Sequence, residues 1–378
     1  MGGAVTALRI GVVGAGQISG AYLATLRRLA NVEVVAVCDL DEARARAAAA
    51  ATPGVRPLAV AELLAADDVD LVLNLTIPAA HAEVAHAAIA AGKHVYGEKP
   101  FAVTTGQARE VLAAAVRAGV RVGCAPDTVL GTGVQTARAR LDAGEIGAPI
   151  AATAFMVTPG HERWHPAPEF YYLPGGGPLF DMGPYYLTAL VTLLGPVRRV
   201  AGMAATPRAT RTIGSGPRAG SEIDVAVATH VTGVLEHANG ALSTLVMSFD
   251  VWAGRLPYIE VYGTGGSLSV PDPNGFGGAV QIFTAGAKDW TLAAEAGGYR
   301  EAARGYGVSD LASALTSGTA HRANGEIAYH VLDVMETILT AADSGNAADV
   351  ASSCDRPRAV PFGSRPDDPS AAPGPRLL

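Results

Sequence analysis

Cysteine is scarce in this chain. Three cysteines, Cys38, Cys124 and Cys354, occur among 378 residues, and no two of them form a CxxC pair. This number and spacing exclude a disulfide framework, and they offer no paired thiolates for a metal or for redox chemistry. We therefore expect the protein in a reducing compartment, the cytoplasm.

Dense basic runs and long apolar runs are also missing. Lys and Arg total 28 against 35 Asp and Glu, a net charge of −7, and no basic run is dense enough to follow a phosphate backbone. The apolar stretch from residue 71 to 91 is broken by Asn74 and Pro78, whereas a membrane-spanning helix needs about 20 apolar residues. We expect neither nucleic acid nor a membrane as a partner. With 49% hydrophobic and 17% charged residues, the composition indicates a globular protein.

The first third of the chain alternates short β-branched runs with alanine-rich segments. Strands are expected at residues 8–13, 32–37, 70–75, 94–96 and 121–124, and helices at 18–30, 41–51, 59–66, 79–91 and 104–118. This alternation is typical of an α/β Rossmann fold, a doubly wound parallel sheet. We assign it to residues 1–125 as a dinucleotide-binding domain.

The pattern changes after residue 125. Strands are expected at 224–237 and 241–250, joined by a hairpin turn at Asn239-Gly240, and further strands follow up to residue 283. Helices expected at 181–194, 308–316 and 326–342 can cover one face of the resulting sheet. Residues 126–360 are therefore expected to form an α+β domain for substrate binding and oligomerisation, with a large, mostly antiparallel open sheet. A partner subunit is expected on the other face, in a homodimer or homotetramer. Residues 361–378 are Pro-rich and are expected to form a disordered tail.

A glycine-rich motif follows the first expected strand. Gly14 and Gly16 allow a tight turn and a close approach of the backbone to a pyrophosphate, and Gln17 and Ile18 lead into a helix whose N-terminus favours phosphate. The second expected strand ends at Asp39, which lies 39 − 16 = 23 residues after Gly16, where a carboxylate can bind the ribose diol. Because Asp39 repels a 2′-phosphate and no cation follows it, NAD is favoured over NADP.

A second motif reads Ala91-Gly-Lys-His-Val-Tyr-Gly-Glu98-Lys99-Pro100 and is preceded by Thr76-Ile-Pro78-Ala-Ala-His81. Together these segments resemble the Gfo/Idh/MocA family, named after glucose–fructose oxidoreductase, inositol dehydrogenase and rhizopine catabolism, and the likeness extends from about residue 8 to 342. The resemblance implies an NAD(P)-dependent oxidoreductase with a Rossmann domain, followed by an α+β domain whose open sheet mediates oligomers. It also implies cofactor contacts by Thr76, Pro78, His81, Glu98 and Lys99.

Lys99 is the first candidate catalytic residue. Oxidation of an alcohol removes a hydride from carbon and a proton from oxygen, so a cation beside that oxygen stabilises the developing alkoxide. Lys99 follows an expected strand at the sheet edge where such folds bind ligands.

A third motif, Asp181-Met-Gly183-Pro-Tyr185-Tyr186-Leu-Thr188, contains the candidates for the base. It resembles a family pattern of Asp, Gly, His and Asp, but Tyr185 and Thr188 stand in the last two places. A phenol has an ordinary pKa of about 10 and is a poor base unless a cation such as Lys99 lowers that pKa. We expect Tyr185 to be the base, with Asp181 as the alternative. Tyr186 is a rival that either meets the substrate or lies in the core.

The segment His161-Glu-Arg-Trp-His165 matches the HExxH zinc pattern. That chemistry needs both histidines on one continuous helix, and the prolines at 159, 166 and 168 leave room for only a turn or two. We therefore expect no metal. The favoured interpretation is a substrate loop in which Trp164 stacks on a sugar and the polar side chains bind hydroxyl groups. The expected substrate contacts are His161, Glu162, Arg163, Trp164 and His165, with Asp127 and Thr128 as weaker candidates.

Three functions remain open on the sequence. The main hypothesis is an NAD-dependent dehydrogenase that oxidises a secondary hydroxyl of a sugar, glycoside or cyclitol. The alternative is a glycosidase that keeps NAD bound and recycles it through oxidation, elimination, water addition and reduction. An inactive NAD-sensing regulator is less favoured, because Lys99 and Asp181 are both retained.

Overall fold

The structure is a computed structural model, and it describes residues 7–368. These residues form two compact units. The first comprises residues 7–131, 298–328 and 360–368, and the second comprises residues 132–297 and 329–359.

The first unit contains a six-stranded parallel sheet in the order β3-β2-β1-β4-β5-β6. Its strands are β1 (Leu8–Val13), β2 (Val32–Cys38), β3 (Arg56–Pro57), β4 (Leu71–Asn74), β5 (His94–Gly97) and β6 (Val122–Cys124). The strand order reverses between β1 and β4, and open α/β sheets bind ligands beside the carboxyl ends of the strands at such a point. The predicted Rossmann fold is confirmed.

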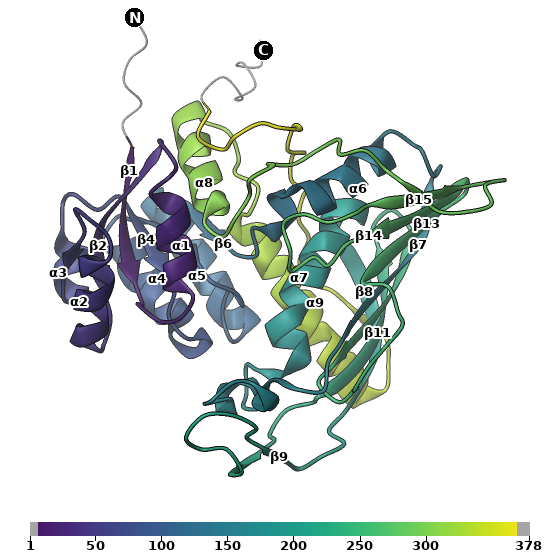
Figure 1. Cartoon of the computed structure of the whole chain (residues 1–378), viewed down its shortest axis with the longest axis horizontal. Coiled ribbons are helices and arrows are strands. Elements are labelled where there is room, and N and C mark those ends of the chain that lie inside the picture. The colour runs from purple at the N-terminus through teal and green to yellow at the C-terminus, as the bar shows by residue number, and fades with distance from the viewer. Residues whose placement is uncertain (1–6, 369–378) are drawn as a thin grey trace, which may run out of the picture. The chain divides into compact units, whose positions relative to one another are not determined.

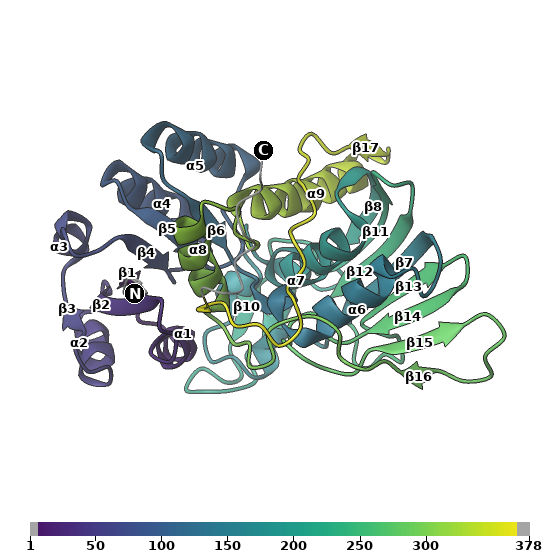
Figure 2. The same ribbon diagram turned by 90° about the horizontal axis from the view of Figure 1, so that it is seen from above.

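Helices cover both faces of this sheet, with α4 and α5 on one face and α1 and α2 on the other (Figure 2). The helices of the first unit are α1 (Ser19–Leu26), α2 (Glu42–Ala50), α3 (Val60–Ala65), α4 (His81–Ala90), α5 (Thr105–Ala118) and α8 (Tyr306–Ser317), with the 3-10 turns η1 (Pro78–Ala80) and η2 (Thr128–Leu130). Local residues set the helix ends. At α5, the Thr104 side chain accepts a hydrogen bond from the Gln107 N–H, and Gly119 ends the helix with a φ of +68°.

Residues 298–328 belong to the first unit, which corrects the expected domain of residues 126–360. The physical reason is a set of long-range backbone contacts. The N–H of Cys124 in β6 donates to the Ala323 carbonyl, and Gly123 forms a β-bridge with Asn324. Pairing over such separations leaves no local signal in the sequence.

The second unit contains a nine-stranded mixed sheet in the order β16-β15-β14-β13-β7-β12-β11-β8-β17, as the labels in Figure 2 show. Its strands are β7 (Pro149–Val157), β8 (Val197–Ala205), β11 (His230–His237), β12 (Leu242–Ser248), β13 (Ile259–Gly263), β14 (Gly266–Val270), β15 (Gln281–Thr284), β16 (Thr291–Leu292) and β17 (Ala348–Asp349). Only the β7–β12 pair is parallel. The predicted large, mostly antiparallel sheet is confirmed, as is the hairpin at Asn239-Gly240, where Gly240 has a φ of +88°.

Helices cover one face of the nine-stranded sheet (Figure 2). They are α6 (Thr132–Asp142), α7 (Gly177–Leu194) and α9 (Gly325–Ser344), of which α9 begins in the first unit. Side chains that point toward these helices, such as Leu235 and Leu245, are fully buried, whereas Met203, Val234 and Leu242 are between 47% and 77% exposed. No helix of the second unit, residues 132–297 and 329–359, packs on the opposite face of this sheet (Figure 1).

Two further expectations need correction. The expected strand at 224–237 is divided into β10 (Glu222–Asp224), which pairs with β9 (Thr210–Thr212), and β11. Between β10 and β11 the backbone forms hydrogen bonds with other segments. For example, the Ala226 N–H donates to the Tyr172 carbonyl. The expected disordered tail is ordered in part, since the Asp367 carboxylate accepts a hydrogen bond from the Ala30 N–H. The remainder of that prediction, residues 369–378, lies outside the described residues.

Within residues 7–368, no helix combines the length and the apolar character needed to cross a bilayer.

Candidate active site

The glycine-rich turn of the first unit follows β1. Gly14 has a φ of +102°, and a Cβ at this position would lie 2.7 Å from the Leu75 carbonyl oxygen, so only glycine fits. A Cβ at Gly16 would meet no atom within 4 Å, which leaves open space beside the turn. Gln17 is exposed and Ile18 is half-buried, and no side chain caps the N-terminus of α1. The turn therefore has the open backbone and the helix end that a pyrophosphate needs.

Asp39 lies directly after β2 and reaches this turn. Its Oδ2 accepts a hydrogen bond of 2.7 Å from the Ala15 N–H, and its Oδ1 accepts one of 2.8 Å from the Asp41 N–H. Each carboxylate oxygen can accept a further hydrogen bond. Asp39 therefore fixes the shape of the turn and keeps acceptor capacity for a ribose diol. Leu40 beside it is 98% exposed and offers no charge to a 2′-phosphate.

The loop after β4 is held from within. The Asn74 side chain accepts a hydrogen bond from the Thr76 hydroxyl and donates one to the His81 carbonyl. The His81 ring is buried, with Nδ1 2.6 Å from the Pro100 carbonyl oxygen and Nε2 3.0 Å from the Thr76 carbonyl oxygen. Burial lowers the pKa of His81. His81 thus joins the loops that carry Thr76, Pro78 and Lys99, and it lies behind them as a positioning residue.

Glu98 and Lys99 follow β5. The Glu98 carboxylate is buried and accepts hydrogen bonds from the Tyr22 hydroxyl at 2.7 Å and from the Lys99 N–H at 3.0 Å. Burial, together with this carboxylate, raises the pKa of Tyr22 well above its ordinary value. Glu98 therefore fixes the backbone from which the half-buried Lys99 side chain extends at the carboxyl edge of the sheet.

Asp127 and Thr128 follow β6 and are completely buried. Asp127 Oδ2 accepts hydrogen bonds from the N–H groups of Gly305 and Gly307, at 2.8 and 3.0 Å, and so holds the start of α8. Burial raises the pKa of Asp127 to about 6. The expected substrate contact is thereby corrected to a structural role within the first unit.

Helix α7 of the second unit carries Asp181 near its start. The helix begins where Gly176 passes so close to the Phe170 carbonyl oxygen that a Cβ would lie 2.4 Å from it. One turn after Asp181, Tyr185 is only 4% exposed. Tyr186 is 1% exposed, and its burial raises its pKa above the ordinary value, so its ring belongs to the core and the expected substrate contact is corrected.

His161 contacts Asp181. The two residues are 20 positions apart, yet His161 Nε2 lies 3.0 Å from Asp181 Oδ2. The His161 ring packs against the rings of Phe249, Tyr171 and Trp164, with centroid distances of 4.4, 4.7 and 5.3 Å. The sequence predicted both residues, but it did not predict that they form a pair.

The HExxH segment forms a single 3-10 turn, η3 (His161–Arg163), after Gly160 with a φ of +110°. His165 lies beyond the turn, where its Nδ1 accepts a hydrogen bond from the Ala167 N–H. The segment therefore lacks the continuous helix of the zinc motif. Among residues 7–368, no group of three or more His, Cys, Asp or Glu side chains is placed to hold a metal.

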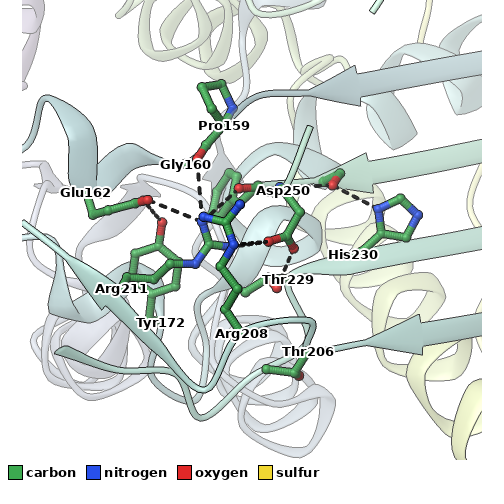
Figure 3. A network of polar contacts seen from close by, with 12 residues as sticks. Pro159, Gly160, Glu162, Tyr172, Thr206, Arg208, Arg211, Thr229, His230 and Asp250 are labelled. Atoms are coloured by element: carbon green, nitrogen blue, oxygen red, sulfur yellow. Dashed lines mark hydrogen bonds and ion pairs between the residues drawn. The ribbon is translucent and has the colours of Figure 1, made fainter. Parts of the chain in front are cut away.

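Glu162 points into the protein and not toward a substrate, which corrects a further expectation. Its buried carboxylate accepts hydrogen bonds from the Tyr172 hydroxyl and from Arg211 (Figure 3). Arg211 lies on β9 with its side chain 1% exposed, and it also donates to the Phe249 carbonyl at 3.1 Å and to Asp250 at 2.5 Å. We name Glu162, Tyr172, Arg211 and Asp250 the Arg211 network. It anchors the backbone next to His161 from a distant part of the chain.

The remaining residues of this loop face outward. Trp164 is 55% exposed, and its carbonyl accepts a hydrogen bond from the Ser215 hydroxyl. The exposed Arg163 guanidinium lies 4.4 Å from the ring centroid of Trp252, which is 64% exposed. These side chains stay predicted substrate contacts. Sequence reasoning missed the Arg211 network, because a single arginine in a polar segment carries no motif.

Known proteins match both units. A family model described as "Oxidoreductase family, NAD-binding Rossmann fold" matches residues 8–125, and one described as "GFO/IDH/MocA C-terminal domain" matches residues 134–269. Inositol 2-dehydrogenase of Klebsiella pneumoniae is 37% identical over 150 residues, which are 38% of this chain and 44% of the relative. The 1,5-anhydro-D-fructose reductase of Ensifer adhaerens is 36% identical over 181 residues, which are 46% of this chain and 53% of the relative. The chain thus matches about half the length of these curated relatives.

A solved structure extends the likeness to nearly the whole chain. An NAD-binding oxidoreductase from Klebsiella pneumoniae aligns with a TM-score of 0.78 and 26% identity, covering 92% of this chain and 99% of that one.

Proposed function

Because this chain belongs to the Gfo/Idh/MocA oxidoreductase family and its first unit is an NAD-binding Rossmann domain, we propose that it is an NAD-dependent dehydrogenase of secondary alcohols. Its substrates are sugars, glycosides or cyclitols. The observation that carries the proposal is Lys99, held by the buried Glu98 at the carboxyl edge of the sheet, in a unit whose Gly14 turn and Asp39 fit a dinucleotide.

When bound, NAD supplies the hydride acceptor, and the residues of the chain bind and orient it. The Gly14 turn and the N-terminus of α1 hold the pyrophosphate, and Asp39 accepts hydrogen bonds from the ribose. Thr76 and Pro78 line the same edge on a loop that His81 keeps in place. Asp39 disfavours the 2′-phosphate of NADP.

In the proposed reaction, the Lys99 ammonium donates a hydrogen bond to the alcohol oxygen and stabilises the charge that develops as the hydride leaves. A base of the chain takes up the proton, and Tyr185 and Asp181 on α7 are the candidates from the sequence. Charge stabilisation and proton transfer are the two tasks that the side chains must perform.

Two observations support a polyol substrate. The named relatives act on inositol and on anhydrofructose. The exposed Trp164 offers an aromatic face of the kind that packs on sugar rings, and Arg163 and His165 beside it offer polar groups for hydroxyls.

The test incubates the protein and NAD with a panel of sugars, cyclitols and aryl glycosides. The absorbance of reduced nicotinamide is followed, and released aglycone is measured in parallel. We expect NADH to accumulate without aglycone. Release of aglycone without NADH would replace the proposal with the recycling glycosidase, and tight NAD binding with no reaction on any compound would favour a regulator.

Replacement of Lys99 tests the assignment of the cation. We expect Lys99→Ala to lower kcat by roughly 100- to 1,000-fold, the usual cost of one lost donor to a developing oxyanion, while calorimetry still detects NAD binding. Lys288→Ala removes an exposed lysine of the second unit and is the matched control. Unchanged turnover in Lys99→Ala would reject this role.

We also propose that the uncovered face of the nine-stranded sheet joins a second copy of the chain in a homodimer or homotetramer. The partly exposed Met203, Val234 and Leu242 on β8, β11 and β12 support this proposal, because such apolar surface favours association.

A further inference from the structure

We propose that His161 is a catalytic residue, the base that accepts the proton of the alcohol, and that Asp181 orients it. This inference rests on the proposed dehydrogenase function and names the group that performs its proton transfer. It replaces the expected base, Tyr185.

The contact with Asp181 selects the tautomer of His161. A carboxylate accepts hydrogen bonds, so at 3.0 Å from Asp181 Oδ2 the His161 Nε2 carries the proton. A neutral imidazole with a proton on Nε2 has its lone pair on Nδ1. Within residues 7–368, His161 Nδ1 has no hydrogen-bond partner. The pair therefore leaves one basic nitrogen ready to receive a proton.

The residues around the His161 ring restrict its movement and leave part of it exposed to solvent. The His161 side chain is 13% exposed and that of Asp181 is 15% exposed, so both are largely desolvated but not closed in. Phe249 and Tyr171 pack against the ring, with centroid distances of 4.4 and 4.7 Å. In surroundings of reduced dielectric, the Asp181 carboxylate stabilises the imidazolium that forms when Nδ1 takes up a proton.

The Arg211 network anchors the residue that follows His161 and the residue whose ring packs on it. Arg211 donates to the side chain of Glu162, the next residue (Figure 3). It also donates to the carbonyl of Phe249, whose ring packs on His161. The Glu162 carbonyl also accepts a hydrogen bond of 2.7 Å from the Gly214 N–H. Because each anchor lies within one residue of His161 or of its ring contact, the imidazole is held in one orientation, as general-base catalysis requires.

Tyr185 is less suited to the same task. Its side chain is 4% exposed, and a phenol has an ordinary pKa of about 10, against about 6.5 for an imidazole. A base is most effective when its pKa lies near the working pH. Imidazoles as a class come closer to this condition than phenols, which need a neighbouring cation to lower their pKa.

The oxidation breaks the carbinol C–H and O–H bonds and forms a carbonyl group. As the carbinol C–H bond breaks, its electron pair and hydrogen leave as hydride for the nicotinamide. The O–H bond breaks, its proton goes to His161 Nδ1, and its electron pair forms the carbonyl C=O bond. The imidazolium then returns the proton to solvent, and Asp181 stays ionised throughout.

Chemical rescue tests the assignment. In His161→Ala, with the best alcohol of the panel, we expect kcat to fall by at least about 100-fold and added imidazole to restore it by more than tenfold. His86→Ala removes a half-buried histidine of α4 that lies outside the proposed site, and it should show neither effect. A His161→Ala enzyme that keeps more than a tenth of its activity, or that imidazole does not restore, overturns the proposal.

A second experiment measures the tautomer of His161 by NMR and does not require a substrate. In ¹⁵N spectra of histidine-labelled protein, we expect the His161 signal, identified by its loss in His161→Asn, to show the Nε2–H tautomer in the wild type and to lose this preference in Asp181→Ala, which removes the acceptor. An unchanged tautomer in Asp181→Ala overturns the pairing. If the wild-type protein oxidises no alcohol, the proposed function fails, while this experiment still decides whether Asp181 orients His161.

Discussion

The carboxyl group of Asp127 is buried, and its titration should make the free energy of unfolding depend on pH. It is completely buried, and burial raises its pKa from 3.8 to about 6. Between these values the folded state keeps a proton that the unfolded chain has lost. Stability from this group is therefore complete below about pH 4 and is lost as the pH rises through 6. The shift of about two units corresponds to about 3 kcal/mol.

The substitution Asp127→Asn removes this titration. An amide oxygen can still accept the hydrogen bonds of Gly305 and Gly307. We expect the free energy of unfolding of the variant, measured against urea, to improve relative to the wild type by about 3 kcal/mol between pH 4 and pH 7. Parallel pH profiles of the two proteins would show that Asp127 does not titrate in this range.

Residues whose role depends on near neighbours were predictable from the sequence. Gly14 and Asp39 follow consecutive strands, and their position relative to those strands was sufficient to indicate the nucleotide turn. Glu162 and Asp127 were misassigned as substrate contacts because their partners, Arg211 and Gly307, are 49 and 180 residues away. A polar side chain in a loop looks the same in sequence whether it faces solvent or a buried partner.

At the scale of elements, the short hairpin of β9 and β10 contributes the cation on which the His161 turn depends. Arg211 neutralises two carboxylates, Glu162 and Asp250, whose side chains are only 6% and 10% exposed. We expect Arg211→Met to cost about 3–5 kcal/mol of unfolding free energy. The change leaves Glu162 buried without its cation, and it leaves Asp250 with only the Arg208 guanidinium, 4.0 Å away.

Arg218→Met is the matched control for this change. Arg218 pairs with Glu169 but is 52% exposed, so its loss should cost less than about 1 kcal/mol. Urea unfolding of both variants checks the contrast. Equal stability of Arg211→Met and Arg218→Met would mean that the Arg211 network adds nothing beyond a surface ion pair.

The prediction of elements succeeded where a turn residue marks a boundary and failed where the backbone changes partner. Asn239-Gly240 correctly indicated the β11–β12 hairpin. Residues 225–229 continue the apolar alternation of a strand, yet their backbone bonds to Ala209, Tyr172 and Ala205. Alternation describes side chains and does not specify which strand the backbone meets.

At the scale of the whole molecule, substitutions on the open face of the nine-stranded sheet test whether the chain forms a homo-oligomer. We expect the wild-type protein to behave as a dimer or larger in light scattering after size exclusion, and Met203→Glu with Val234→Glu to shift it toward the monomer, because charges on an apolar interface must be desolvated. The control is Val116→Glu on α5, a position that is 82% exposed in the first unit. A monomeric wild type would contradict the proposed assembly.

The division of the chain into segments bears on how the protein is made. The first unit is completed only by residues 298–328 and 360–368, and the second only by residues 329–359. During synthesis, about 200 residues are added after Cys124 before Ala323, whose carbonyl accepts a hydrogen bond from the Cys124 N–H, has been made. The second unit can therefore finish folding on the ribosome only after residues 329–359 have emerged, and the first only after residues 360–368 have emerged. A fragment ending at residue 131 would leave β6 without its backbone partners Ala323 and Asn324, so the nucleotide sheet is completed by chain made long after its own strands.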